Sequence, residues 1–208
     1  MPATRERVPL PWRDTRRAGM VAHQKGEAML LDASHSFLAV VDVQERLAPA
    51  MTAGEDAIAR CALLMKAAQR LEVPVLLSEQ YPKGLGPTVP ALAALAPEGA
   101  TVAKLHFSCA EEPKFIDKVE TLRRDHAVIC GMEAHVCVLQ TAIGLADRGY
   151  AVIVVEDAVA SRKPSDKAAA LRRMERAGVS IVTSEMVVFE WLGQAGTPAF
   201  KELSQLIR

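Results

Sequence analysis

Aromatic residues are scarce in this sequence: Phe, Trp and Tyr make up 4% of its 208 residues, whereas 50% of the residues are hydrophobic. The interior must therefore be built mainly from Ala, Val, Leu and Ile, as in layered α/β proteins. A chain of this length is long for one average domain and short for two. We expect one domain with terminal extensions.

An excess of charge of one sign is also missing. Lys and Arg total 25, as do Asp and Glu, so no net field attracts nucleic acid, an anionic membrane or a strongly charged protein. No apolar run reaches the roughly 18 residues that a membrane-spanning helix needs. We therefore expect a small-molecule substrate as the partner, and neither nucleic acid nor membrane.

The four cysteines lack the paired spacing of a disulfide framework or a zinc site. This usage fits a reducing compartment, so we expect a cytoplasmic protein. Residues 1–28 contain an Arg16-Arg17 pair, but the apolar segment of an export signal does not follow it. We expect these residues to form a poorly ordered arm, or a leader if initiation occurs at Met29, ahead of a domain over 29–208.

Short β-branched apolar runs alternate with amphipathic stretches from residue 37 onward, which is the pattern of right-handed βαβ units. Most runs are apolar throughout, so both faces of their strands should be buried between helix layers. We predict a three-layer αβα, Rossmann-like fold with a six-stranded, mostly parallel sheet. The expected strands are 37–43, 73–78, 101–105, 127–131, 151–155 and 180–183.

The amphipathic stretches predict helices over 55–71, 113–124, 136–148 and 165–177, with a short closing helix within 197–208. Pro113 suits a first helical position, Ser165 an N-cap, and Gly149 and Gly178 the positions that follow a helix. The stretch 81–90 is rich in Gly and Pro and should form a long ordered loop without regular structure.

Three reactive side chains fall where the predicted strands end. Asp42 ends the first run, Lys104 ends the third, and Cys137 follows the fourth by a few residues and opens the next helix. Ligands of open parallel sheets bind at the carboxyl ends of the strands, near the point where the strand order reverses. The three side chains should therefore meet on one rim of the sheet.

These residue types suit acyl-transfer chemistry. A thiolate is the reactive form of cysteine, and the free amides of a helix N-terminus favour it, so we expect the position of Cys137 to activate it. Lys104 would favour the thiolate further, and Asp42 could take the thiol proton and return it to a leaving group. Backbone amides of the sharp turn, those of Glu133 or Ala134 and of Cys137, could hold an oxyanion.

Each residue also has a simpler explanation. Asp42 could cap a turn or pair with Arg46, and Lys104 could be a solvated strand end. Cysteine is among the most buried residue types, and we expect Cys61 and Cys130 to fill the core. Cys109 follows Lys104 closely and either borders the site or has no role.

At these same positions the sequence resembles the isochorismatase-like cysteine hydrolases, over residues 35–208. The matching stretches are VVDVQ at 40–44, the strand-ending Lys104, CGMEAHVCV at 130–138 with TA at 141–142, SEQYPKGLGPTVP at 78–90 and FKEL at 200–203. The last two resemble one subgroup, the isochorismatase domain-containing proteins. The resemblance implies Cys137 as nucleophile, Asp42 as general acid/base and Lys104 as support for the thiolate.

The resemblance also implies features around these residues. A cis peptide is expected just before the nucleophile helix, at Met132-Glu133. Metal-dependent nicotinamidases of similar fold carry Asp-x-His and a further His after the second strand, whereas this sequence has no histidine there. We therefore expect no metal and no cofactor. The expected lining of the substrate pocket is Glu79, Gln80, Tyr81, Phe107 and His135.

Together these features predict a hydrolase that cleaves an amide-type C–N bond of a small molecule through a thioester. One alternative is vinyl-ether hydrolysis of the isochorismatase type, which does not need the cysteine. Another is a ligand-binding or redox-sensing protein on the same fold. The apolar stretch 187–192 fits either the core or subunit packing, and we expect a homo-oligomer.

Overall fold

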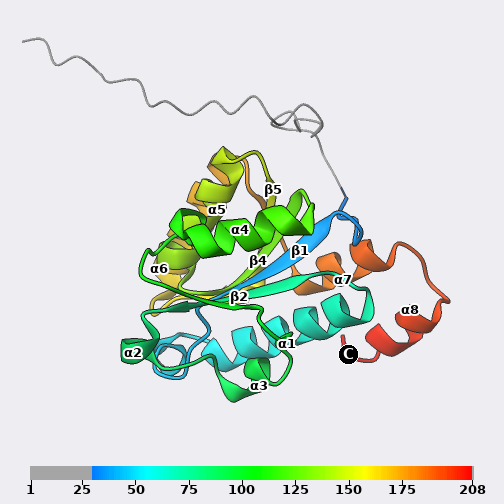
Figure 1. Ribbon diagram of the computed structural model, residues 1–208. Coiled ribbons are helices and arrows are strands. Elements are labelled where there is room, and N and C mark those ends of the chain that lie inside the picture. Colours follow the sequence, from blue (N-terminus) through cyan, green and yellow to red (C-terminus); the bar gives the residue numbers. More distant parts are fainter. Residues whose placement is uncertain (1–29, 208) are drawn as a thin grey trace, which may run out of the picture.

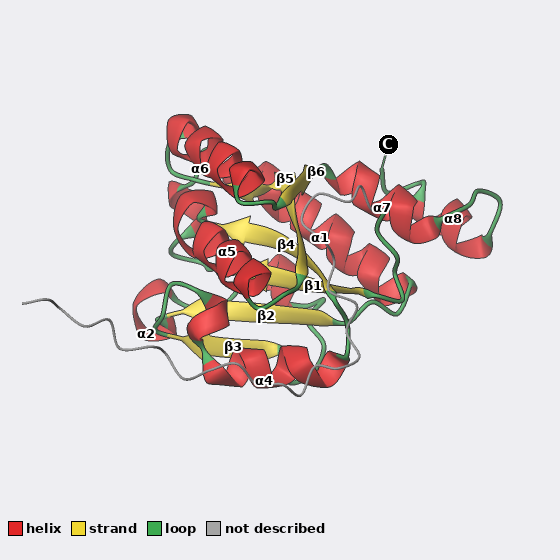
Figure 2. Ribbon diagram, turned by 90° about the horizontal axis from the view of Figure 1, so that it is seen from above, coloured by secondary structure: helices red, strands yellow, loops and turns green. Residues whose placement is uncertain are grey.

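The computed structural model describes residues 30–207, so the expected N-terminal arm lies outside the described residues. Six strands form one sheet in the order β3-β2-β1-β4-β5-β6, and every neighbouring pair is parallel. The predicted three-layer αβα fold is confirmed, with helices on both faces of the sheet (Figures 1 and 2). The strands are β1 (Ser36–Val41), β2 (Val75–Gln80), β3 (Thr101–Lys104), β4 (His126–Met132), β5 (Ala151–Ala160) and β6 (Ser180–Val182).

One helical layer packs on β1 and β4 through a core cluster that includes Leu38, Leu64, Val128 and Trp191. Its helices are α1 (Gly54–Arg70), α3 (Pro90–Ala93), α7 (Ser184–Leu192) and α8 (Pro198–Leu203). The apolar stretch 187–192 thus belongs to the core on this side, where Val187, Val188 and Trp191 are buried. The indole N–H of Trp191 donates to Ser36 Oγ at 3.0 Å, so its one polar group has a partner.

The other layer covers the opposite face, where Phe37, Ala39 and Ile129 belong to a second core cluster. Its helices are α4 (Pro113–Leu122), α5 (Leu139–Asp147) and α6 (Pro164–Arg176), with the 3₁₀ turn η2 (Cys109–Glu111) beside α5 (Figure 1). Proline opens α4 as predicted, and Gly149 and Gly178 follow α5 and α6 with positive φ. The N-cap of α6 is Lys163 rather than Ser165, because Pro164 already occupies the first turn.

Three further local predictions were wrong. The stretch 81–90 contains a four-residue helix, α2 (Pro82–Leu85), which Pro82 can open because its φ is already helical. The fifth strand continues through the polar residues Glu156 and Asp157 to Ala160, with a register shift against β4. The helix expected from residue 136 begins at Ala134 with a π-helical turn, η3 (Ala134–Val138).

No helix among residues 30–207 combines the length and apolar character needed to cross a membrane.

A short 3₁₀ turn, η1 (Ala48–Ala50), links the end of β1 to α1.

The contact between β1 and β4 depends on Gly131. Its φ is +120°, and a methyl group there would overlap the backbone carbonyl and amide of Val41. We predict that Gly131→Ala lowers the free energy of unfolding by about 3 kcal/mol or more, because backbone atoms cannot move aside. Urea denaturation measures the change.

Gly99→Ala is the matched control, since Gly99 also has positive φ but no atom within 4 Å of the added methyl. Its expected cost is about 1 kcal/mol, from the backbone conformation alone. Equal losses in the two variants would contradict the steric explanation.

Candidate active site

The site lies where the strand order reverses, between the neighbouring strands β1 and β4. From β1 the chain continues to β2 and β3 on one side, and then crosses to β4 on the other. Asp42 directly follows β1, and Cys137 lies in η3, which follows β4. Parallel strands thus bring two of the three predicted reactive residues to the switch point.

Asp42 is fully buried and accepts two side-chain hydrogen bonds. Ser78 Oγ donates to its Oδ1 and Lys104 Nζ to its Oδ2, each at 2.7 Å. Its φ is +51°, a conformation that Asp adopts more readily than most residues. Its partner is Lys104 rather than Arg46, whose guanidinium donates to the Gly84 carbonyl.

Lys104 ends β3 and its side chain has no exposed surface. Besides Asp42, its ammonium group has three acceptors within reach: Gln80 Oε1 at 2.7 Å, and the carbonyls of Phe107 at 3.0 Å and His106 at 3.2 Å. It is therefore no solvated strand end. A buried ion pair is tolerated where such additional hydrogen bonds compensate the lost water.

Cys137 lies in the π-helical turn and is 5% exposed. The Glu133 carbonyl accepts from the backbone N–H of Val136 and, in the i to i−5 spacing of a π-helix, from that of Val138. The Asp42 carboxylate lies close enough to the Cys137 thiol for its charge to raise the pKa of that thiol. The three predicted residues thus lie together.

The protonation state of Cys137 differs from the expectation. Burial raises the pKa of its thiol well above the usual value, and the charge and hydrogen bond of Asp42 raise it further; the charge of Lys104 lowers it only in part. The helix N-terminus therefore does not make a resting thiolate. At neutral pH the Cys137 thiol keeps its proton, beside the pair of Asp42 and Lys104.

The turn before Cys137 contains the expected cis peptide, at Met132-Glu133. The Glu133 side chain is buried and points to the loop after β5, where Arg162 donates to its Oε2 from Nε at 3.0 Å and from the backbone N at 3.3 Å. These contacts join the turn to the β5–α6 loop.

Two of the five residues expected to line the substrate pocket have side chains that are hydrogen-bonded to other protein groups. Glu79 Oε1 accepts from the backbone N and the hydroxyl of Thr88, which fixes the loop after α2. Gln80 is buried and bonded to Lys104. Tyr81 and Phe107 are 52% and 54% exposed, so both side chains are accessible at this edge.

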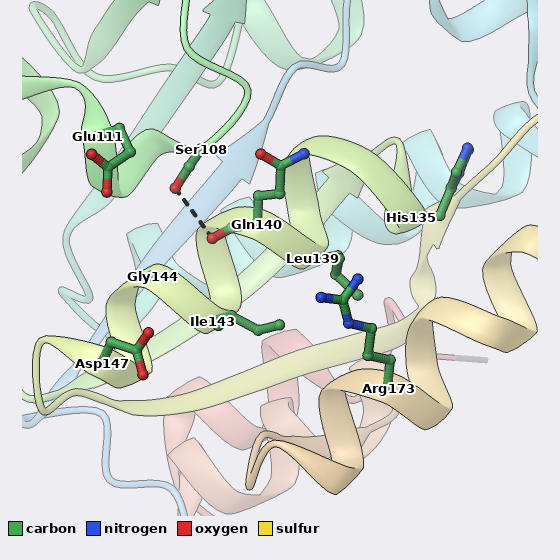
Figure 3. A pocket seen from close by; sticks show the side chains of 9 residues that line it. All are labelled: Ser108, Glu111, His135, Leu139, Gln140, Ile143, Gly144, Asp147 and Arg173. Atoms are coloured by element: carbon green, nitrogen blue, oxygen red, sulfur yellow. Dashed lines mark hydrogen bonds between the residues drawn. The ribbon is translucent and has the colours of Figure 1, made fainter. Parts of the chain in front are cut away.

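His135, the fifth residue, bonds to Ser161 Oγ through Nδ1 at 3.0 Å and borders a groove of about 450 Å³ on the outer face of α5. Figure 3 shows its ring pointing away from the other lining side chains. The groove is lined by Ser108, Glu111, His135, Leu139, Gln140, Ile143, Gly144, Asp147 and Arg173. It does not include Asp42, Lys104 or Cys137, so it is separate from their site.

Two residues near the site were missed or left open by the sequence. Ser78 binds Asp42, and it could have been found because it is a polar residue near the end of an apolar run, the signal that singled out Asp42.

Cys109 is fully buried, and its backbone N–H donates to Thr141 Oγ1, one helical turn beyond Cys137. Burial raises the pKa of Cys109 to about 11, with the charge of Lys104 opposing the rise. The other two cysteines, Cys61 and Cys130, are core residues as expected.

No group of three or more His, Cys, Asp or Glu side chains suited to hold a metal ion occurs within residues 30–207.

Comparison with known sequences gives a match to the family described as the isochorismatase domain, over residues 36–186. The chain belongs to the isochorismatase family. Isochorismatase domain-containing protein 2 from Homo sapiens is 39% identical over 175 residues, covering 83% of each chain. The Xenopus laevis protein of the same name is 38% identical over 172 residues, again covering 83% of each.

Solved structures share the fold of this isochorismatase-family chain. The MAR1 ribonuclease from Caenorhabditis elegans is 38% identical, with a TM-score of 0.81 over 86% of this chain and 92% of that one. The YcaC gene product of Escherichia coli, an octameric hydrolase of unknown specificity, shares the fold, with a TM-score of 0.82, 22% identity and coverage of 86% and 91%.

The buried thiols of this isochorismatase-family protein predict a loss of stability at alkaline pH. In the unfolded chain a thiol ionises near pH 8.5, whereas folded Cys109 keeps its proton to about pH 11. Between these values the unfolded state binds fewer protons, so each such thiol lowers the free energy of unfolding by about 1.4 kcal/mol per pH unit. Urea unfolding from pH 7 to 10.5 measures the slope.

Cys109→Ala removes one of these thiols and should make the alkaline slope shallower by about 1.4 kcal/mol per pH unit. The comparison uses slopes, because the lost side chain also lowers stability at pH 7 by a pH-independent amount. Identical slopes for the two chains would show that Cys109 ionises normally in the fold.

Proposed function

We propose that this chain is a cysteine-dependent hydrolase that cleaves a C–N bond of a small amide through a thioester intermediate. The observation that carries the proposal is the placement of the Cys137 thiol beside the Asp42 carboxylate, whose two oxygens accept from Ser78 and Lys104. A carboxylate held ionised beside a neutral thiol is a general base next to a nucleophile.

In the proposed first step, Cys137 Sγ attacks the carbonyl carbon of the amide while Asp42 takes the thiol proton. Asp42 then gives that proton to the departing nitrogen as the C–N bond breaks. Water cleaves the thioester with Asp42 again accepting a proton, and the thiol is restored. Protonation of a leaving amine needs an acid next to the reacting atoms, and the proximity of Asp42 to the Cys137 thiol supports that role.

The oxyanion formed at the carbonyl needs donors that are fixed before the reaction. We assign this role to the backbone N–H of Glu133 or Ala134 and that of Cys137. The support is their location around the nucleophile: Glu133 is the N-cap of the π-helical turn, and Ala134 and Cys137 lie within it. Lys104 does not serve here, since its ammonium group is surrounded by protein acceptors.

Ribonuclease activity is a second candidate, favoured by the name of the 38% identical protein from Caenorhabditis elegans. Two features of this chain favour a small neutral substrate instead. Its acidic and basic residues balance, and the cation of the site is enclosed, so it offers a phosphate no free donor. Vinyl-ether hydrolysis, the reaction of isochorismatase, is a third candidate that would proceed without a nucleophilic cysteine.

The decisive substitution is Cys137→Ala. We expect it to lower the turnover of a small primary amide by about 10³-fold or more, because the proposed acyl intermediate forms on the sulfur that this variant lacks. Ammonia release from an amide panel measures turnover, and intact mass of the wild type reveals the acyl adduct on Cys137. We expect chelation by EDTA to leave the rate unchanged, since no metal takes part in the proposed steps.

Controls separate the candidates. Cys109→Ala removes a neighbouring thiol and should retain most activity. A labelled RNA oligonucleotide, incubated with the same preparations, tests for ribonuclease activity. If the wild type cleaves it, Cys137→Ala does not, and no amide is turned over, ribonuclease activity would replace amide hydrolysis as the proposed function. Full amide or vinyl-ether turnover by Cys137→Ala would remove the cysteine from the mechanism, and absence of all turnover would favour a binding or redox-sensing protein.

We also propose that the protein is a cytoplasmic homo-oligomer. All four cysteines are free thiols, which suits a reducing compartment. Three large apolar side chains, Tyr81, Leu105 and Phe107, are 52%, 72% and 54% exposed, and the backbone N–H of Tyr81 donates to the carbonyl of Lys104, next to Leu105. Neighbouring exposed apolar residues of this size support an interface with a second copy.

Leu105→Glu tests the interface. We expect the wild type to exceed the 22.5 kDa of one chain in light scattering after size exclusion, and the variant to shift toward that mass because a carboxylate cannot be buried without a partner. Leu206→Glu, at a residue that is 43% exposed near the C-terminus, is the control and should not dissociate the oligomer. A monomeric wild type at micromolar concentration would contradict the proposal.

A further inference from the structure

Gln80, the last residue of β2, has protein partners on all its polar groups. Its backbone N–H donates to Gln44 Oε1 at 2.8 Å, and its carbonyl accepts from Gln44 Nε2 at 3.0 Å. In its side chain, Oε1 accepts from Lys104 Nζ at 2.7 Å and Nε2 donates to the Leu105 carbonyl at 2.9 Å. The carbonyl partner fixes the orientation of the amide, because only the NH₂ group can face it.

The surroundings of Lys104 require a cation. An ammonium group has three protons, and four acceptors surround this one, so a neutral amine would leave more of them unsatisfied. Asp42 is the only one of the four that carries charge. Because the Gln80 amide is neutral, the whole positive charge of Lys104 is left to stabilise the Asp42 carboxylate.

Gln44 holds the backbone of Gln80 in place. It is fully buried, and its Nε2 also donates to the Gly86 carbonyl at 2.6 Å, which joins the end of β2 to the loop after α2. The amide plane of Gln80 is therefore fixed from its backbone and from its side chain.

We propose that Gln80 serves the site through its neutrality: its amide accepts a hydrogen bond from Lys104 without adding a negative charge that would compete with Asp42, the base for Cys137. The inference rests on the proposed function, in which Asp42 deprotonates the thiol. It replaces the expectation that Gln80 lines the substrate pocket, since a substrate would have to displace Lys104 or Leu105 from the amide.

Gln80→Glu tests the role of charge with almost no change of shape. An ionised carboxylate would compete with Asp42 for Lys104 and bring the net charge of the pair from zero to −1, which opposes ionisation of the thiol. We expect alkylation of Cys137 by iodoacetamide at pH 8, followed by intact and peptide mass, to be at least 10-fold slower than in the wild type. We expect the pH dependence of this alkylation rate to shift to higher pH by one unit or more.

The difference in alkylation rate between Gln80→Glu and the wild type should become smaller toward pH 6. There the carboxylic acid is protonated and offers a donor and an acceptor, as the amide does. The variant is therefore purified at pH 6, where its fold should match the wild type by circular dichroism. The titratable groups around Lys104 are Asp42, Cys137 and Cys109. His106 contributes only its carbonyl, and its exposed ring lies near Glu112.

Two further variants separate charge from contact. Gln80→Met removes the acceptor and leaves three acceptors for the three ammonium protons, so its alkylation profile should stay within 0.3 pH unit of the wild type, about the error of such a measurement. Gln140→Glu adds the same charge at an exposed position one turn from Cys137, and water should screen it to less than a twofold effect.

A Gln80→Glu profile that superimposes on the wild type would overturn the proposal. Equal shifts in Gln80→Glu and Gln80→Met would also overturn it, because lost packing would then explain both. These readings do not depend on turnover of any amide, so a failed substrate panel would reject the proposed function and leave this inference to be judged by the alkylation profiles.

Discussion

Asp42 and Lys104 form an ion pair with no exposed side-chain surface on either partner. Removing two charges from water costs several kcal/mol for each ion, and their attraction repays this only if the remaining donors and acceptors are satisfied. Ser78 completes the carboxylate, while Gln80 and two backbone carbonyls complete the ammonium group. These partners come from the ends of β1, β2 and β3 and from the loop after β3. The ion pair therefore requires these strand ends to be in register.

The same pair determines what the cysteine can do. A buried thiol beside a carboxylate stays protonated, so in the proposed mechanism the nucleophile forms when the proton moves to Asp42 during attack and is not a standing thiolate. Such a resting state also protects the sulfur, since oxidants and electrophiles react mainly with thiolates. The structure thus favours a nucleophile that forms on demand over one that is always charged.

Much of this was predictable from sequence because parallel strands carry a strong signal. Short runs, most of them apolar throughout, predicted all six strands, and the rule that ligands bind at strand ends selected Asp42, Lys104 and Cys137. The extension of β5 was missed because Glu156 and Asp157 interrupt its apolar run. Asp157 is there for another reason: its carboxylate accepts from the backbone N and the hydroxyl of Ser184 at the start of α7.

The state of Cys137 and the partner of Gln80 could not be read from spacing. Helix position suggested a thiolate, but the degree of burial and the sign of the nearest charge decide the pKa, and both are tertiary properties. Gln80 has the same sequence signal whether its amide faces a ligand or a lysine. Only the side-chain geometry distinguishes these cases.

The contacts on the two sides of the site differ in their exposure to water. On the side of β2 and β3, Lys104 and Gln80 link neighbouring strand ends through bonds that water cannot reach. On the side of β5, the link is the pair of Glu133 with Arg162, whose side chain is 61% exposed. Water competes with such a surface pair, so local opening costs less free energy there. Local opening is therefore expected first at the β5–α6 loop, on the Arg162 side of the candidate site.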